Sequence, residues 1–413
     1  ENDMGALAVL DEAMAVYFRA PHSYTGEDMF ELNLHGSYSV VSAVSRALTR
    51  RGMRLAEAGE FTKRAFLNGK MDLVQADAVM DLINAETRRG ASAALEQLEG
   101  GLSRRIGAIE EKLLDFASEL AAAMDYPEEM EDEVLSAAPE VLNSAISRIR
   151  DLIDNGNCNK IIREGAKLAI LGRPNVGKSS LLNALMNAER AIVTNIAGTT
   201  RDVLEEKIDL LGLPVRIADT AGIHETGDAV EKIGIERALH EAASAECVLL
   251  LFDGSAGITQ EDERLVQKVF GMNCRNVIFV INKCDLSDCG TAAEQLKNIA
   301  PENVRSISRI SCRTGFGLDE LKHRIAEAVG LSEGRAIVTN ERHIECLSAA
   351  CAELCEAAEL FSKGGNAAEM LLPQTELVAE SVGNALHCLG EISGREVSEE
   401  LLDRIFERFC VGK

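Results

Sequence analysis

A short apolar segment that leads straight into a glycine-rich loop and then a helix constrains this 413-residue chain more than any other feature. Residues 168–171 are all apolar, residues 172–179 read Gly-Arg-Pro-Asn-Val-Gly-Lys-Ser, and residues 181–186 continue as a helix. This order is typical of a phosphate-binding P-loop, whose backbone N–H groups surround phosphate oxygens. Lys178 is then expected to neutralise the β- and γ-phosphates, and the Ser179 hydroxyl to bind Mg²⁺.

Two later motifs indicate that the nucleotide carries guanine. Residues 282–285 read Asn-Lys-Cys-Asp and follow the apolar run 277–281, at the place where a base-reading loop belongs. The Asp285 carboxylate can accept hydrogen bonds from guanine N1–H and from the exocyclic amine, which adenine lacks. Residues 311–313, Ser-Cys-Arg, match the type of loop whose backbone reads guanine O6. GTP is therefore the predicted substrate.

Two motifs that lie between the P-loop and residues 282–285 are expected to close over the γ-phosphate and its metal ion. Residues 219–222, Asp-Thr-Ala-Gly, supply an acid that orients Mg²⁺, usually through water. Residues 198–202, Gly-Thr-Thr-Arg-Asp, contain Thr200, the expected second Mg²⁺ ligand beside Ser179. The predicted GTP-binding residues are Asn175, Val176, Gly177, Lys178, Ser179, Ser180, Thr194, Asn195, Ile196, Ala197, Gly198, Thr199, Thr200, Asp219, Thr220, Ala221, Gly222, Asn282, Lys283, Asp285, Ser311, Cys312 and Arg313.

The residue that follows the Asp-Thr-Ala-Gly motif is unusual. It is Ile223, so the glutamine that orients the attacking water in Ras-like enzymes is absent, and another group must do this work. The candidates are the downstream carboxylates of Glu225, Asp228, Glu231 and Glu236. Asn175 is also unusual, because its amide oxygen can help to bind a monovalent cation beside the phosphates in place of an arginine finger.

The apolar pattern divides the chain into an α/β part and helical parts. Residues 167–328 alternate short apolar runs with amphipathic helices, which is the pattern of a parallel sheet covered on both faces. Helical spacing dominates before and after this part, with an acidic turn expected at residues 125–133 and Ser398 as the N-cap of the last helix. Residues 6–72 mix strand and helix patterns and predict a small α+β unit.

The predicted fold class is a multidomain chain of α/β and α type. A Ras-like P-loop domain, residues 164–330, is inserted into a helical domain whose halves are residues 73–163 and 331–413. A small α+β domain, residues 1–72, precedes them. The chain opens with Glu1 rather than Met, so we expect a piece of the natural N-terminal domain to be missing.

Charge and cysteine usage exclude several classes of protein. A net charge of −24 argues against a surface that binds phosphate backbones throughout, because such binding depends on Lys and Arg. No apolar run approaches the roughly 18 residues that a membrane span needs.

The eleven cysteines show no Cys-x-x-Cys spacing, and Cys284, Cys289 and Cys312 lie among the nucleotide motifs. This usage predicts free thiols in a reducing, cytoplasmic compartment.

Several segments outside the α/β part carry a family resemblance. Residues 21–28, PHSYTGED, and 59–70, GEFTKRAFLNGK, with the terminal FCVGK at 409–413, resemble the tRNA modification GTPase family MnmE, also called TrmE. Further matches are residues 172–180, 198–202 and 233–238. The resemblance covers nearly the whole chain. It implies a folate-binding N-terminal domain that dimerises, a helical domain and an inserted GTPase domain that potassium activates.

The resemblance also implies a reaction and its partners. Proteins of this family act as homodimers with a flavin-dependent partner, MnmG (GidA), in a heterotetramer through which tRNA is largely bound. Together they install an aminomethyl or carboxymethylaminomethyl group on C5 of the wobble uridine of certain tRNAs. The one-carbon unit comes from tetrahydrofolate, in its 5-formyl or 5,10-methylene form.

By motif, the resemblance assigns roles to individual residues. Glu231 inherits the water-orienting role, and Lys178 and Asn175 complete the predicted catalytic set. The residues expected around K⁺ are Asn175, Thr194, Ile196 and Thr199. Those expected at the folate are Glu31, Lys70 and Lys413, and Cys410 falls where the family has a proposed functional thiol. His224 stands where many relatives have arginine, so no role of that arginine is carried over.

Two other interpretations stay open. One is a ribosome-associated GTPase switch of the Era or Der type, which binds RNA without modifying it. Against it, the C-terminal half has no basic Gly-x-x-Gly loop of an RNA-binding KH domain. The other is a dimeric scaffold whose GTPase only regulates the partner enzyme.

Overall fold

The computed structural model groups the chain into two compact units. The described residues are 9–125, 127–188, 206–217, 239–272, 274, 276–300, 306–329, 340–363 and 372–409. The helical unit comprises Glu1–Met80, Glu96–Ile149 and Glu345–Lys413, and the α/β unit comprises Asp81–Leu95 and Arg150–Ile344. The division into three domains at the boundaries given above stays a prediction.

The α/β unit is built on a six-stranded sheet with the order β4-β5-β3-β6-β7-β8. Its strands are β3 (Ala166–Gly172), β4 (Glu206–Leu210), β5 (Leu213–Ile217), β6 (Cys247–Asp253), β7 (Val277–Asn282) and β8 (Ser306–Arg309). All neighbouring pairs are parallel except that of β4 with β5, which is antiparallel. The predicted parallel sheet is confirmed, with one antiparallel strand at its edge.

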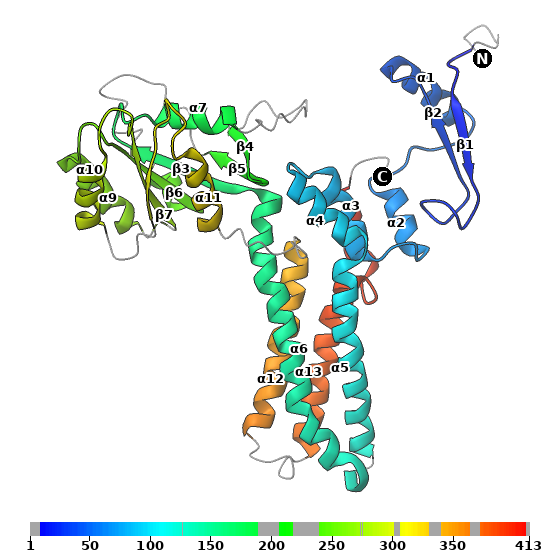
Figure 1. The fold of residues 1–413 in the computed structure, drawn as a ribbon. Helices are drawn as coiled ribbons and strands as arrows, with labels where there is room; N and C mark the ends of the chain where they lie inside the picture. Colours follow the sequence, from blue (N-terminus) through cyan, green and yellow to red (C-terminus); the bar gives the residue numbers. More distant parts are fainter. Residues whose placement is uncertain are drawn as a thin grey trace. The chain divides into compact units, whose positions relative to one another are not determined.

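Alternate residues of the central strands enter two separate cores, one on each face of this sheet. In β6, Leu249 and Leu251 belong to one core, and Leu250 and Phe252 belong to the other. The helices of the unit that cover these cores are α7 (Lys178–Ala188), α9 (Gln260–Gly271), α10 (Gly290–Ile299) and α11 (Leu318–Ala328) (Figure 1). α7 and α11 pack on the first core, and α9 and α10 on the second. Burial on both faces explains why the strands read as continuous apolar runs.

Long helices run alongside one another in the helical unit (Figure 1). They are α5 (Gly101–Asp125), α6 (Pro127–Glu164) up to Ile149, α12 (Glu341–Lys363) and α13 (Leu372–Ser393). The buried apolar side chains of α5 recur every three or four residues and include Leu102, Ile106, Ile109, Leu113, Phe116 and Leu120. This spacing forms one apolar face, as the sequence pattern predicts.

The acidic turn predicted at residues 125–133 is wrong. α6 begins at Pro127, so most of these residues form the first turns of a helix. Proline suits the first helical position because its missing N–H needs no partner there. Acidic residues are favoured in the same region, because the N-terminal end of a helix dipole is positive. A composition that is typical of a turn is here the start of a helix.

The chain also contains a two-stranded hairpin and several shorter helices. The elements are β1 (Met14–Phe18), β2 (Met29–Asn33), α1 (Tyr38–Thr49), α2 (Glu60–Leu67), α3 (Leu73–Ile83), α4 (Arg88–Leu98) and α14 (Glu399–Phe406). β1 and β2 pair antiparallel. The Ser398 hydroxyl accepts a hydrogen bond from Leu401 N at 3.3 Å, which confirms the predicted N-cap. Among the described residues, no helix combines the length and apolarity that a bilayer span requires.

We expect Leu113→Ala to lower the free energy of unfolding by about 2–5 kcal/mol, because Leu113 is fully buried and its truncation leaves a cavity in the bundle. Leu114→Ala is the matched control on the same helix, since that side chain is 49% exposed, and its effect should stay below about 1 kcal/mol. Urea unfolding followed by circular dichroism measures both. Equal losses would contradict the assigned core face of α5.

Candidate nucleotide-binding site

The P-loop connects the end of β3 to the start of α7. Gly172 has no room for a side chain, because a Cβ there would lie 2.6 Å from the Leu251 carbonyl oxygen. Asn175 takes a left-handed backbone conformation, with φ of 63°. Lys178 Nζ donates to the carbonyl oxygens of Gly172 (2.8 Å) and Arg173 (2.9 Å), so its side chain folds back over the loop. The N-terminal N–H groups of α7 open onto the same loop, as an anion site requires.

The side chain of Asn282 joins this loop to the two base-reading loops. Its Nδ2 donates to the Val176 carbonyl oxygen (2.9 Å), and its Oδ1 accepts from the Cys312 backbone N–H (3.1 Å). Gly177, with φ of 104°, leaves the space that the amide occupies. Asn282 is only 3% exposed, so both bonds lie out of water. Three segments far apart in sequence are thus held by one side chain.

Lys283 makes a second link from the base loop to the P-loop. Its Nζ donates to the Asn175 carbonyl oxygen at 2.8 Å and pairs with the Asp253 carboxylate at 2.6 Å. Burial tends to raise the pKa of Asp253, but hydrogen bonds from Lys283 and Ser255 outweigh it and leave that pKa below its usual value. No sequence motif marks Asp253, and its only signal is its position directly after the apolar run 247–252.

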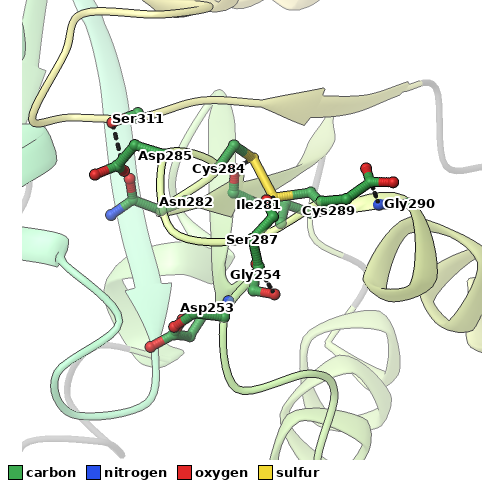
Figure 2. The surroundings of a disulfide bond; sticks show 12 residues. Asp253, Gly254, Ile281, Asn282, Cys284, Asp285, Ser287, Cys289, Gly290 and Ser311 are labelled. Atoms are coloured by element: carbon green, nitrogen blue, oxygen red, sulfur yellow. Dashed lines mark hydrogen bonds between the residues drawn. A yellow bond between two sulfur atoms is a disulfide. The ribbon is translucent and has the colours of Figure 1, made fainter.

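The carboxylate of Asp285 is oriented by a buried hydroxyl. Ser311 Oγ donates to Asp285 Oδ1 at 2.7 Å, and Figure 2 shows the two side chains facing each other beside Asn282. Ser311 is buried, whereas Asp285 and Arg313 are exposed. The remaining acceptor positions of the carboxylate are therefore accessible to the N–H donors of a base.

An ion pair anchors the P-loop to α9. Arg173 Nε lies 2.7 Å from Asp262 Oδ1, and Asp262 is buried. The same carboxylate accepts from Thr259 N at 2.9 Å as part of the capping box of α9. The sequence does not predict this ion pair, because Arg173 and Asp262 are 89 positions apart.

The first turn of α7 contains Ser179, which is half-buried, and Ser180, which is exposed. The structure therefore brings together the predicted residues of the P-loop and of both base loops. Other predicted residues of the site lie outside the described part of the chain: Thr194, Asn195, Ile196, Ala197, Gly198, Thr199, Thr200, Asp219, Thr220, Ala221, Gly222 and Glu231. The roles assigned to all of these residues, at the nucleotide, at Mg²⁺, at K⁺ and at the attacking water, stay predictions.

Cys284 and Cys289 form a disulfide, with their Cα atoms 5.7 Å apart (Figure 2). The expectation of free thiols is therefore wrong for this pair, and it holds for Cys312. The chain turns back between β7 and α10, which brings two cysteines five positions apart within bonding distance. Sequence spacing alone does not reveal this path.

The predicted folate residues fall in the helical unit or beyond the described residues. Glu31 is exposed on β2, and Lys70 Nζ donates to the Pro21 carbonyl oxygen at 2.9 Å. Cys410 and Lys413 lie past the last residue that the structure describes. Their role at a folate is not tested by these contacts and stays a prediction.

The helical unit also contains a pocket of about 300 Å³ whose described lining includes neither Glu31 nor Lys70. The lining residues are Thr25, Glu27, Asp28, Met29, Phe30, Arg54, Ala56, Glu60, Phe61 and Arg64. Arg54 donates to both carboxylate oxygens of Glu60 (2.7 and 2.6 Å), and Arg64 donates to one of them (2.6 Å). Hydrogen bonds from Arg54, with help from Arg64, hold the pKa of Glu60 at about 2. Both arginines of the pocket are thus paired with Glu60, and Arg64 is also paired with Glu27.

Two family models match consecutive parts of the chain. One, described as GTP-binding protein TrmE N-terminus, matches residues 3–70. The other, described as MnmE helical domain, matches residues 73–410, which is well over half of the sequence. The chain belongs to the MnmE family.

Relatives of nearly full length agree with this membership. The tRNA modification GTPase MnmE of Alkaliphilus oremlandii is 40% identical over 416 residues, which cover 98% of this chain and 86% of the relative. That of Moorella thermoacetica is 43% identical over 413 residues, with the same coverage. A solved structure of Era in complex with MgGDPNP and nucleotides of 16S ribosomal RNA is 29% identical, covers 46% of this chain and 66% of that chain, and has a TM-score of 0.32.

Membership of the MnmE family makes the chain a GTPase that acts in tRNA modification. It confirms the predicted fold class, in which one chain combines a P-loop GTPase domain with helical and TrmE-type N-terminal domains. The Era or Der type of ribosome-associated switch is not favoured, because the matches that cover nearly the whole chain are MnmE proteins.

We expect Asn282→Ala to weaken GDP binding by roughly tenfold or more, because two loops lose a buried hydrogen bond worth about 1–3 kcal/mol. Asn276→Ala is the matched control at the other end of β7, where the Asn276 amide donates to the Glu246 carbonyl oxygen at 3.1 Å. That change should lower stability without changing nucleotide affinity. Fluorescence titration with mant-GDP measures binding, and a similar loss of affinity in both variants would show that Asn282 acts only through stability.

Proposed function

We propose that GTP binds across the P-loop and the two loops 282–285 and 311–313. The carrying observation is that Ser311 orients the Asp285 carboxylate at 2.7 Å, in a base loop that Asn282 joins to the P-loop. Asp285 then accepts hydrogen bonds from the two N–H donors of guanine, while the P-loop amides and Lys178 bind the phosphates. Ser179 and Thr200 would hold Mg²⁺, which would supply positive charge to the phosphates.

Hydrolysis is proposed to be activated by K⁺. Asn175 supports this, because it is exposed in the P-loop while Lys283 fixes its backbone carbonyl. A monovalent cation held by its amide oxygen would balance the negative charge that develops on the phosphate oxygens. Thr194, Ile196 and Thr199 complete the proposed ligand set, and Glu231 orients the attacking water in place of the missing glutamine.

The GTPase cycle is proposed to drive modification of C5 of the wobble uridine of certain tRNAs, as an aminomethyl or carboxymethylaminomethyl group. The protein would act as a cytoplasmic homodimer with an MnmG-type, FAD-dependent partner that contributes most of the tRNA contact. Family membership supports this reaction. The alternative of a scaffold with a merely regulatory GTPase makes a different prediction for hydrolysis-deficient variants.

The one-carbon donor is proposed to be a 5-formyl or 5,10-methylene tetrahydrofolate bound by the N-terminal domain. In support, two of the segments that carry the family resemblance, 21–28 and 59–70, contact each other directly. Lys70 donates to Pro21 O, and Asn68 Nδ2 donates to Thr25 O at 2.8 Å. The proposed folate ligands are Glu31, Lys70 and Lys413, with Cys410 as the functional thiol.

Potassium is expected to accelerate GTP turnover by roughly tenfold or more over sodium at matched ionic strength, because it supplies positive charge beside the phosphates in place of an arginine finger. Asn175→Ala should lose this stimulation. Asn183→Ala, which removes an exposed asparagine from α7, is the matched control and should keep it. Phosphate release in KCl and in NaCl gives the rates. Equal, slow hydrolysis in both salts would rule out the potassium mechanism.

Glu231→Ala is expected to abolish wobble-uridine modification while GTP and the partner protein still bind, because the carboxylate serves hydrolysis rather than binding. Nucleoside mass spectrometry of tRNA after incubation with the partner reports modification, and mant-GTP titration reports binding. Normal modification by a variant that no longer hydrolyses GTP would instead favour the scaffold interpretation.

A further inference from the structure

A disulfide lies within the loop to which the proposed function assigns guanine recognition. Cys284 stands between Lys283 and Asp285, and Cys289 is the residue directly before α10. The covalent ring formed by residues 284–289 therefore contains Asp285 (Figure 2). Neither sulfur has a part in the binding or hydrolysis of GTP described above.

We propose that Cys284 and Cys289 form a thiol–disulfide exchange site that reacts with small disulfides and dithiols and sets how long guanine nucleotide stays bound. The proposal rests on the guanine contact assigned to Asp285. In the oxidised form the ring restricts the loop and retains the nucleotide. In the reduced form the loop samples more conformations and releases the nucleotide faster.

The two sulfur atoms differ in access, which fixes the order of the exchange. Cys284 is half-buried, whereas Cys289 is 3% exposed, so an external thiolate reaches Cys284 first. Its attack on Cys284 Sγ breaks the S–S bond, and Cys289 leaves as a thiolate that takes up a proton. The second thiol of a dithiol reductant then displaces Cys284 as a thiol, and the reductant ends as a disulfide. Oxidation is the reverse, with a small disulfide accepting two electrons and leaving as two thiols.

The surroundings of the pair fit both redox states. Cys284 Sγ lies 3.5 Å from the Ile281 carbonyl oxygen, and Cys289 Sγ lies 3.7 Å from that of Ser287. A thiol at either position can donate to these oxygens, so reduction leaves neither sulfur without a polar partner. Gly254 provides the space for Cys289, because a Cβ there would lie 2.6 Å from Cys289 Sγ.

The third cysteine of this region is poorly suited to the exchange. Burial raises the pKa of Cys312 to about 11, so its thiol stays protonated at neutral pH. The thiolate is the reactive form in exchange, so Cys312 is a poor partner for external disulfides.

Hydrogen bonds on both sides of the ring couple its redox state to the position of Asp285. Ser311 holds Asp285, and Ser287 Oγ donates to the Gly254 carbonyl oxygen at 2.9 Å. With the ring closed, these contacts confine the loop to few conformations. Opening the ring restores conformational freedom that binding must remove again. Because the other contacts remain, we expect a moderate effect, with dissociation of GDP roughly three- to tenfold faster after reduction.

The test uses the full chain, oxidised with glutathione disulfide or reduced with dithiothreitol. Alkylation followed by peptide mass spectrometry reports the state of Cys284 and Cys289, and the dissociation rate of mant-GDP reports the effect. We expect Cys289→Ser to release mant-GDP at the reduced rate under both conditions. If that variant fails to fold, Cys284→Ser serves the same purpose at a more exposed position. Cys274→Ser, which changes a cysteine outside the nucleotide loops, should keep the full response.

The outcomes separate this proposal from the proposed function. Equal dissociation rates in the oxidised and reduced wild-type protein, with the change of state verified by mass spectrometry, would overturn the exchange site and leave GTP binding intact. Failure of the disulfide to form with any ratio of glutathione disulfide to glutathione would also overturn it. Absence of mant-GDP binding in both states would overturn the guanine site itself.

Discussion

The buried amide of Asn282 is the interaction on which the geometry of the site depends. It donates to the P-loop at Val176 and accepts from the 311–313 loop at Cys312, and it lies almost entirely out of water. Leaving a buried hydrogen bond unmade costs free energy. The two bonds of Asn282 therefore hold the P-loop and the 311–313 loop in fixed positions relative to each other. These contacts therefore fix the distance between the proposed position of the base and the proposed position of the phosphates.

The topology of the sheet explains why one side chain can reach all three segments. The strands β3, β6, β7 and β8 run parallel. Their carboxyl ends therefore lie side by side along the same end of the sheet. The P-loop, Asp253, Asn282 and Ser311 all lie at these ends or just after them, although they are spread over residues 172–311. Ligands of open α/β sheets bind at this end. The convergence of four loops is thus a consequence of strand direction rather than of any contact along the sequence.

Features that depend on neighbouring residues could be predicted, and features that depend on the path of the chain could not. The strand, loop and helix around Lys178 and the cap at Ser398 follow from local chemistry, and the structure contains both. Pro127 shows the limit, because an acidic stretch suits a turn and a helix start equally well. The pair of Arg173 with Asp262 and the disulfide of Cys284 with Cys289 depend on how distant or looping segments meet. Neither hydrophobic periodicity nor residue spacing in the sequence predicts these contacts.

The pairing of charges around the P-loop bears on how hydrolysis is promoted. Arg173 is the one arginine in residues 172–179, and its guanidinium is bound to the buried carboxylate of Asp262. Lys283 is likewise committed to Asp253. Breaking either pair to serve a phosphate would leave a buried or half-buried carboxylate without its partner, which costs several kcal/mol for buried pairs. Additional positive charge at the γ-phosphate must therefore come from outside these two residues, and the cation proposed at Asn175 would supply it without breaking either ion pair.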